Sequence, residues 1–246
     1  QILMKKLLLL LFSILFSFNS YGKTICVVTD TEYIDGIFFL PNMTKPFTGN
    51  NLCKYENGQI KSQGKLINGI FEGKLTTWYT NGQIEEEINL KDNMEDGNQT
   101  YWYENGQKMV EENYKDGILH GKFTSWLENG QKVRETNHKD GEYHGKQTSW
   151  YENGQIEIEG NFKDGKSDGY WTKWYENGQL REANNYKDGK DDGNFTSWYE
   201  NGQQWGEGSF KDGKEDGKFT AWNENGQLIF EVTYEDGECI SVDCFD

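Results

Sequence analysis

The stretch that decides the fold is Lys146-Gln-Thr-Ser-Trp-Tyr-Glu152, followed by Asn153-Gly154, a return segment from Gln155 to Phe162, and the turn Lys163-Asp-Gly-Lys-Ser-Asp-Gly169. Both longer parts are rich in Thr, Trp, Tyr, Ile and Phe, which favour strands. Asn-Gly is a strong hairpin signal because a type I′ turn needs positive φ at both central positions. The stretch therefore predicts two antiparallel strands joined by a tight turn and followed by a second, longer turn.

This unit recurs every 24 residues without insertion, which is the signature of a repeat array. The Gly of Asn-Gly-Gln keeps this interval: Gly58, Gly82, Gly106, Gly130, Gly154, Gly178, Gly202 and Gly226. Both ends of the array depart from the pattern, as capping units do. The sequence predicts an all-β fold, an elongated antiparallel β-meander of about eight 24-residue β-hairpin repeats in a single twisted sheet with atypical capping ends.

The side of the sheet on which Trp150 lies depends on the turn. A two-residue turn, which Glu-Asn-Gly-Gln favours, pairs Tyr151 with Ile156. Trp150 then lies on the side of Glu159. A three-residue turn with a Gly bulge shifts the pairing by one and places Trp150 on the side of Ile156 and Phe162. Both arrangements remain open at this point, and both place aromatic rings on the two sides of the sheet.

Composition excludes several classes of protein. Hydrophobic residues make up 34% of the chain, below the roughly 45–50% of typical globular domains. Aromatic residues reach 15%, so the apolar content lies in large rings rather than in a thick aliphatic core. The net charge of −16 argues against nucleic-acid and anionic-membrane partners, because both require basic patches.

The first residues resemble a secretory signal. Met4-Lys5-Lys6 precedes an apolar run from Leu7 to Phe18, and the small residues Ser20 and Gly22 follow. The run is shorter than the roughly 20 residues of a membrane-spanning helix. The sequence predicts an exported protein, whether periplasmic, cell-surface or secreted, that does not stay in the membrane after cleavage. The predicted organisation is a signal peptide at 1–22, an N-terminal cap at 23–46, a repeat array at 47–237 and a C-terminal cap at 238–246.

Four cysteines fit export, because an even number in an oxidising compartment indicates disulfides. Cys26 and Cys53 lie before or within the first repeat, whereas Cys239 and Cys244 lie at the far end. The simplest pairing is therefore Cys26 with Cys53 and Cys239 with Cys244. Zinc is disfavoured because no Cys-x-x-Cys occurs and the chain has three His.

No catalytic, metal-binding or cofactor-binding residues are expected. The loops place two carboxylates four residues apart, as in Asp164 and Asp168, but Asp-Gly is also what a turn requires. His120 and His144 occupy the same position in adjacent repeats, roughly 10 Å apart, and are interpreted as turn residues. No nucleophile motif or phosphate-binding loop is present, so the chain is predicted not to be an enzyme.

The repeated string Tyr-Glu-Asn-Gly-Gln … Asn-Tyr-Lys-Asp-Gly-Lys-x-Asp-Gly-Lys-Phe resembles the MORN (membrane occupation and recognition nexus) repeat in its bacterial variant, in which many members carry a YwqK-like antitoxin label. Paired glycines such as Gly165 and Gly169 match the family's Asn-Gly-Lys-x-His-Gly hairpin, and His120-Gly121 keeps its His. The resemblance covers 33–237. It implies a β-hairpin ribbon used for protein or membrane contact, not catalysis.

One Trp per repeat forms a candidate binding stripe, because aromatic rings carry much of the energy of interfaces. The alternative is that each Trp packs against its neighbour one repeat away. The predicted function is that of an exported protein-binding or scaffolding module. Two alternatives are a polysaccharide or cell-wall binder, and an antitoxin or immunity-type protein that neutralises a partner by surface contact. The stripe consists of Trp78, Trp102, Trp126, Trp150, Trp174, Trp198 and Trp222.

Overall fold

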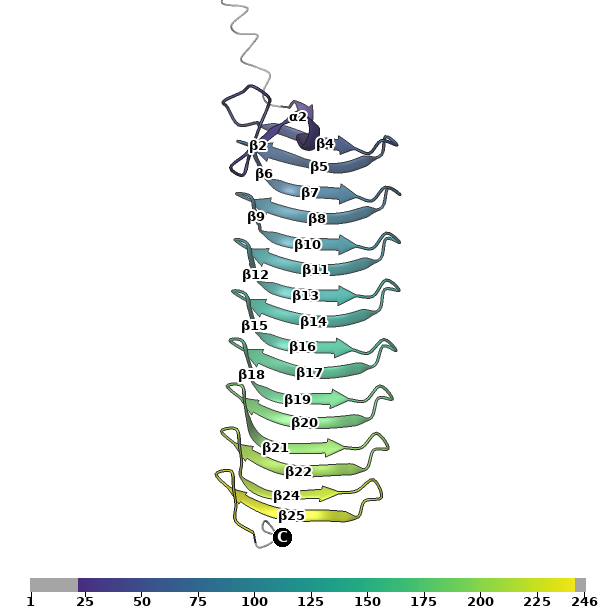
Figure 1. The fold of residues 1–246 in the computed structure, drawn as a ribbon, viewed down its shortest axis with the longest axis vertical. Coiled ribbons are helices and arrows are strands. Elements are labelled where there is room, and N and C mark those ends of the chain that lie inside the picture. Colours follow the sequence, from purple (N-terminus) through teal and green to yellow (C-terminus); the bar gives the residue numbers. More distant parts are fainter. Residues whose placement is uncertain (1–21, 242–246) are drawn as a thin grey trace, which may run out of the picture. The chain divides into compact units, whose positions relative to one another are not determined.

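The computed structural model of the chain describes residues 22–241. The predicted signal peptide, apart from its last residue, therefore lies outside the described residues. The described part of the chain comprises two compact units, residues 22–109 with 113–118 and residues 110–112 with 119–241. Twenty-four strands belong to one open sheet, which confirms the predicted all-β class. Figure 1 shows that long strands follow one another side by side within each unit, with turns alternating between the two edges.

Each 24-residue repeat contributes three strands rather than the predicted two. The first long strand ends at the Trp, or at Lys54 in the first repeat. It is found at β4 (Gly49–Lys54), β7 (Gly73–Trp78), β10 (Gly97–Trp102), β13 (Gly121–Trp126), β16 (Gly145–Trp150), β19 (Gly169–Trp174), β21 (Lys190–Trp198) and β24 (Gly217–Trp222). The second is found at β5 (Ile60–Ile67), β8 (Ile84–Lys91), β11 (Lys108–Lys115), β14 (Lys132–Lys139), β17 (Ile156–Lys163), β20 (Leu180–Lys187), β22 (Gln204–Lys211) and β25 (Leu228–Glu235).

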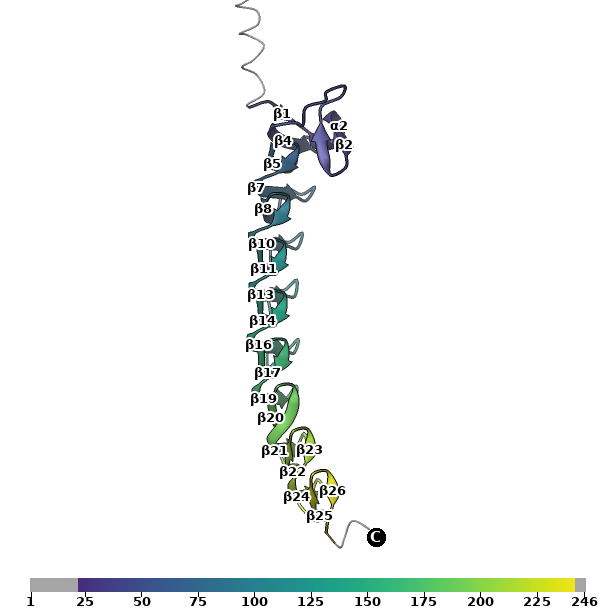
Figure 2. The same cartoon turned by 90° about the vertical axis from the view of Figure 1, so that its left-hand side faces the viewer.

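The third strand has two residues and folds back on the second. It is found at β6 (Ile70–Phe71), β9 (Met94–Glu95), β12 (Ile118–Leu119), β15 (Glu142–Tyr143), β18 (Lys166–Ser167), β23 (Lys214–Glu215) and β26 (Glu238–Cys239), and in one repeat it is continuous with β21. Figure 2 shows β23 and β26 to one side of the long strands of their repeats.

The Asn-Gly turn differs from the favoured prediction. Gly154 has positive φ, 89°, but Asn153 does not, so the turn is not type I′. The Gly154 N–H donates to the Tyr151 carbonyl at 3.0 Å and the Tyr151 N–H donates to the Gln155 carbonyl at 2.9 Å, which encloses three residues. The prediction of a two-residue turn was therefore wrong, and the three-residue turn with a Gly bulge is the one observed.

The primed two-residue turn occurs instead at the opposite edge, inside the predicted long turn. Asp164 and Gly165 both have positive φ, 48° and 77°, as this turn type requires. The register pairs Lys163 with Lys166 across it. An Asp at the first position fits because Asp tolerates the left-handed region better than bulky residues do.

The N-terminal cap covers the outer edge of β4 and holds the aliphatic core of the first unit. It consists of β1 (Thr24–Ile25), the short helix α2 (Val27–Asp30) and the hairpin of β2 (Glu32–Ile34) with β3 (Ile37–Phe39). Strand β1 pairs with β4 in parallel, so the sheet is mixed rather than wholly antiparallel. The buried apolar residues of this cap and the first repeat are Ile25, Val27, Phe47 and Leu66.

The disulfide between Cys26 and Cys53 ties this cap to β4, as the sequence predicted. Cys239 is also disulfide-bonded, and its predicted partner, Cys244, lies outside the described residues. Replacing Cys26 and Cys53 together by Ser should lower the free energy of unfolding by about 3–4 kcal/mol, because the bond closes a loop with a sequence separation of 27. Urea denaturation of the double variant measures this loss. An unchanged midpoint would show that the cap does not limit stability.

Candidate functional site

The register decides which side of the sheet carries the Trp row. Trp150 pairs with Ile156, but the next pair joins Ser149 to Ile158, so Glu157 is skipped in a second irregularity. Skipping Glu157 restores the alternation of side chains between the two faces of the sheet, so Trp150 lies on the same face as Glu159. Trp150 therefore lies on the side of the sheet that was expected for a two-residue turn, although the observed turn has three residues. We call this side of the sheet the Trp face.

The opposite side, here called the ladder face, carries two runs of contacting rings in the second unit, most of them edge to face. Ring centroids lie 5.0 Å apart between Tyr143 and Phe162 and 4.9 Å apart between Phe162 and Trp171. Trp171, which lies outside the periodic Trp row, fills the space above Gly160, where an added Cβ would come within 2.1 Å of its ring. These rings stabilise the single-layer sheet. The two runs of rings are Phe123, His138, Tyr143, Phe162, Trp171 and Tyr186, then Phe195, Phe210, Phe219 and Tyr234.

His138 takes an aromatic position in this series and is 9% exposed. Its Nε2 lies 3.0 Å from the Thr136 hydroxyl, and Arg134 lies over the Tyr143 ring beside it. Burial lowers the pKa of His138 and the nearby Arg134 charge lowers it further, against a backbone hydrogen bond with Gly141 that raises it. The imidazole is therefore neutral at pH 7.

Stability should fall as the pH drops below about 6.5, because the unfolded chain then binds a proton that folded His138 resists. His138→Phe, which copies Phe162 of the next repeat, should flatten this slope. Urea midpoints between pH 7.5 and pH 5 compare it with wild type and with His144→Asn at a partly exposed position. Equal slopes for all three proteins would contradict a stabilising neutral His138.

On the Trp face, all seven Trp of the candidate stripe are partly exposed. Within the described part of the second unit, none of the ring contacts of Trp150, Trp174, Trp198 and Trp222 joins two members of the row. Whether each Trp of the row packs against its neighbour one repeat away or contacts a partner stays a prediction. Lys132 lies over the Trp150 ring, with Nζ 5.6 Å from the centroid. This contact shows that a ring of the row accepts a cation.

A ladder of tyrosine hydroxyls holds the Trp backbone in place. In most repeats a Tyr follows the Trp position and donates its hydroxyl to the Trp carbonyl one repeat later, as from Tyr151 to Trp174 at 2.7 Å. Burial raises the pKa of Tyr151, so the hydroxyl keeps its proton. Leu127 occupies this position in one repeat and has no hydroxyl to donate. The other such bonds are Tyr55 to Trp78, Tyr79 to Trp102, Tyr175 to Trp198 and Tyr199 to Trp222.

The Asn of most Asn-Gly-Gln turns adds a second tie between repeats. Asn153 Nδ2 donates to the Glu176 carbonyl at 2.6 Å, and Asn153 Oδ1 accepts from the Gln155 N–H at 2.9 Å. The side chain thus fixes its own turn and the next turn together. The sequence carried a signal for both ladders, since the Tyr and Asn keep the 24-residue period, but that signal was read as strand and turn propensity alone.

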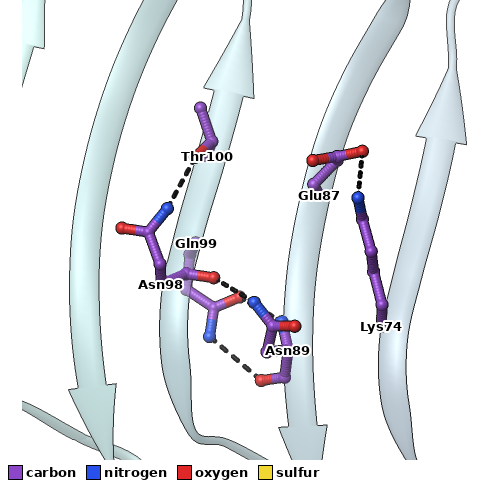
Figure 3. A network of polar contacts seen from close by, with 6 residues as sticks. All are labelled: Lys74, Glu87, Asn89, Asn98, Gln99 and Thr100. Carbon is purple, nitrogen blue, oxygen red and sulfur yellow. Dashed lines mark hydrogen bonds and ion pairs between the residues drawn. The ribbon is translucent and has the colours of Figure 1, made fainter.

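Polar and charged side chains lie between the rings on the Trp face. In the first unit, Lys74 Nζ lies 2.5 Å from Glu87 Oε1, and Asn98 Nδ2 donates to Thr100 Oγ1 at 3.0 Å (Figure 3). Gln99 lies on the ladder face and makes two hydrogen bonds with the backbone of Asn89 in the neighbouring strand. Equivalent ion pairs recur in later repeats: Lys122 with Glu135, Lys146 with Glu159, and Lys218 with Glu231.

The polar surface between the rings has a depression in each unit. A depression of about 550 Å³ in the first unit is lined by Lys74, Thr76, Trp78 and Glu87, among others. A second, of about 350 Å³ in the second unit, is lined by residues that include Thr196, Glu207 and Lys218. At one position the Lys is replaced by Tyr170, which is 74% exposed on the same face. The Trp face is therefore concave in places and carries exposed rings above paired charges.

The His and Asp side chains at the Asp-Gly edge contact the turn of the following repeat. His120 Nδ1 lies 3.4 Å from the backbone N of Asp140, and His144 Nδ1 lies 3.5 Å from Asp164 Oδ1. Asp192 accepts from the Asp212 N–H in the same way. Among residues 22–241 no cluster of three or more His, Cys, Asp or Glu could hold a metal. Over the same residues, no helix has the length and apolar character to cross a membrane.

These features define a class of protein, a single-layer repeat protein in which each β-hairpin unit contacts its neighbours and one face presents a periodic row of rings. The model of the MORN repeat variant matches seven consecutive units, at 71–92, 95–116, 119–140, 143–164, 167–188, 191–212 and 215–236. The chain belongs to the MORN repeat family. The matched region begins after the first Asn-Gly-Gln unit, and comparison with curated proteins finds no match for the chain.

Proposed function

We propose that the protein is an exported, non-catalytic binding module that holds a partner protein on its Trp face. The observation that carries this proposal is the partly exposed Trp row on one side of the sheet, where Trp78 also lines the depression of the first unit. A MORN repeat array is a repeat-protein module, which supports binding rather than catalysis. Export is supported by the first 22 residues and by the cysteines, which are disulfide-bonded where the structure describes them.

The chemistry of this face fits a protein partner. Partly exposed Trp and Tyr rings are enriched at the centres of protein interfaces, where each contributes more than neighbouring contacts do. The Lys–Glu pairs beneath them are partly exposed and add register rather than much energy. The net charge of −16 steers basic partners toward the chain.

Replacing Trp126, Trp150 or Trp174 by Ala should weaken partner binding by about 1–3 kcal/mol each, because exposed rings carry interface energy. The loss of stability should be smaller than for a fully buried ring, since each ring is partly exposed. The mature chain, immobilised, captures partners from extracts of its own exported compartment, and titration of the captured molecule gives the affinity. Trp171→Phe on the ladder face is the matched control and should bind like wild type.

The captured molecule also separates the finer possibilities. A toxin whose activity is lost on binding would indicate an antitoxin or immunity role of the YwqK-like kind, and a cell-wall glycan would replace the protein partner with a polysaccharide. Full binding by all three Ala variants would exclude the Trp face. Ala variants that unfold, with binding lost only through unfolding, would show that the Trp row stabilises the sheet and does not bind the partner.

A further inference from the structure

The two depressions on the Trp face occupy equivalent positions in the repeat pattern. Asn50 and Lys74 line the depression of the first unit, and Asn194 and Lys218 line that of the second. Each residue of the second pair follows its counterpart by 144 residues, which is six repeats of 24. A depression that recurs at the same point of the repeat has a cause in the sequence of those repeats.

The cause is the residue that follows the Gly of the first long strand. In four repeats this residue is a Lys that reaches across to a Glu of the second long strand, as Lys74 Nζ reaches Glu87 Oε1 at 2.5 Å (Figure 3). Asn50 and Asn194 stand at this position in the two repeats that have a depression. An Asn side chain is too short to span the same distance, so the space that a Lys would fill stays open.

The polar groups around the two openings are free to bind a ligand. The side-chain amides of Asn50, Gln63 and Asn194 are exposed and make no hydrogen bond within the part of the chain that the structure describes. Thr76 adds a hydroxyl to the first depression and Thr196 adds one to the second. Amides and hydroxyls both donate and accept hydrogen bonds. A ligand with several hydroxyl groups matches such a set.

The charges around the openings favour a neutral ligand. The Lys that lines each depression is paired with a Glu at 2.5 Å. The remaining charged side chains are Lys65 at the first depression and Glu207 at the second, and their charges are opposite. Neither an anion nor a cation therefore suits both depressions, whereas a neutral hydroxylated molecule does.

Trp78 gives the first depression an aromatic wall. Its ring is partly exposed, and the depression of about 550 Å³ lies within the size range of small-molecule sites. Aromatic faces pack against apolar surface. A pyranose with equatorial hydroxyls presents such a surface, because its C–H groups point to the two sides of the ring and its hydroxyls lie around the rim. A sugar ring can thus lie on Trp78 while its hydroxyls reach the neighbouring amides.

We propose that the first depression binds a neutral saccharide of β-linked pyranose units, with one sugar ring on Trp78 and its hydroxyls bonded to the amides of Asn50 and Gln63. The second depression is smaller, about 350 Å³, and has no Trp in its lining, so it binds the same class of ligand more weakly. Both sites are open to solvent, so the expected dissociation constant is about 1 mM. This inference does not rest on the proposed protein partner, because the three Trp chosen to test that partner line neither depression.

Titration of residues 23–246 with cellobiose, a neutral β-linked disaccharide, tests the proposal by ¹H–¹⁵N NMR up to about 50 mM, well above the expected dissociation constant. The side-chain amide signals of Asn50 and Gln63 and the indole signal of Trp78 should shift together and saturate with one dissociation constant. Sorbitol has hydroxyls but no ring and should bind at least about tenfold more weakly, because it cannot stack on Trp78. Absence of saturable shifts with cellobiose, or equal binding of sorbitol, would overturn the proposal.

Variants that rebuild the ion pair identify the site. Asn50→Lys combined with Gln63→Glu copies the pair of four other repeats, so it should fill the first depression, keep the fold and abolish the shift of the Trp78 indole. Tyr170→Lys places the same side chain at the same position of another repeat and is the matched control, which should bind like wild type. Asn194→Lys should remove binding at the second depression alone. Retained binding at Trp78 in the double variant, or an equal loss in the Tyr170 variant, would refute the assignment.

Discussion

Deleting Asn161–Asn184 should leave a folded protein with a modest loss of stability, whereas deleting Asn161–Thr172 should abolish cooperative unfolding. The longer deletion removes one whole 24-residue unit and joins Gly160 to Asn185. Gly160 then faces Phe195, which keeps a small residue beneath a ring. It also removes Asn184, whose buried Oδ1 has no hydrogen-bond partner in the described structure.

The shorter deletion joins Gly160 to Lys173 and is half a period long. The next Asn-Gly turn is then placed at the edge where an Asp-Gly turn belongs, so the strands cannot keep their alternation. Because repeat arrays gain stability unit by unit, the first deletion costs about one unit's share. Circular dichroism and urea denaturation distinguish the two outcomes. Equal folding of both variants would mean that the turns do not set the phase of the sheet.

Trp171→Ala should lower the free energy of unfolding by about 3 kcal/mol, the lower end for loss of a large buried ring, because Trp171 is partly exposed. The change removes edge contacts with Phe162 and Tyr186, and the bond from the Trp171 Nε1–H to the Asn161 carbonyl at 3.1 Å. It also uncovers Gly160. Trp171→Phe should cost much less, because Phe219 covers Gly208 in the same way two repeats later.

Gly160→Ala tests the same contact from the other side. The new methyl would lie 2.1 Å from the Trp171 ring, so the ring must move, at a cost of about 1–3 kcal/mol. Gly206→Ala is the matched control, because its nearest neighbours, the Ser197 hydroxyl and the Thr220 carbonyl, lie at 3.3 Å and 3.7 Å. Its effect should be small. Equal urea midpoints for the two variants would show that Trp171 does not depend on Gly160.

The period, the two long strands of each repeat and the Cys26–Cys53 bond could be predicted from the sequence, because each follows from local spacing or from simple pairing. The geometry of the Asn-Gly turn could not. Isolated Asn-Gly favours a primed turn, but Asn153 is also bound to the Glu176 carbonyl of the following repeat. A contact 23 residues away therefore accompanies a turn that local propensity did not predict.

The structural role of Trp171 was also missed, because it lies outside the row of periodic Trp. The relevant pattern pairs a small residue with a large one 11 positions later, as in Gly160 with Trp171 and Gly208 with Phe219. This complementarity becomes visible once the register between successive repeats is known. Whether the Trp face binds a partner stays a prediction, since geometry places the rings there without showing an occupant.

The doubly tied asparagines have a consequence for the chemical ageing of the protein. An Asn followed by Gly is prone to deamidation, because the Gly nitrogen can attack the side-chain carbonyl, and Asn is among the thermolabile residues. In Asn153, hydrogen bonds to both ends of the amide hold it away from that attack. Asn225 lies in the last turn, where Asn223 instead accepts the Gln227 N–H. Among the Asn-Gly-Gln turns, spontaneous damage should therefore begin at Asn225 and at Asn129, whose described side-chain bond lies within its own turn.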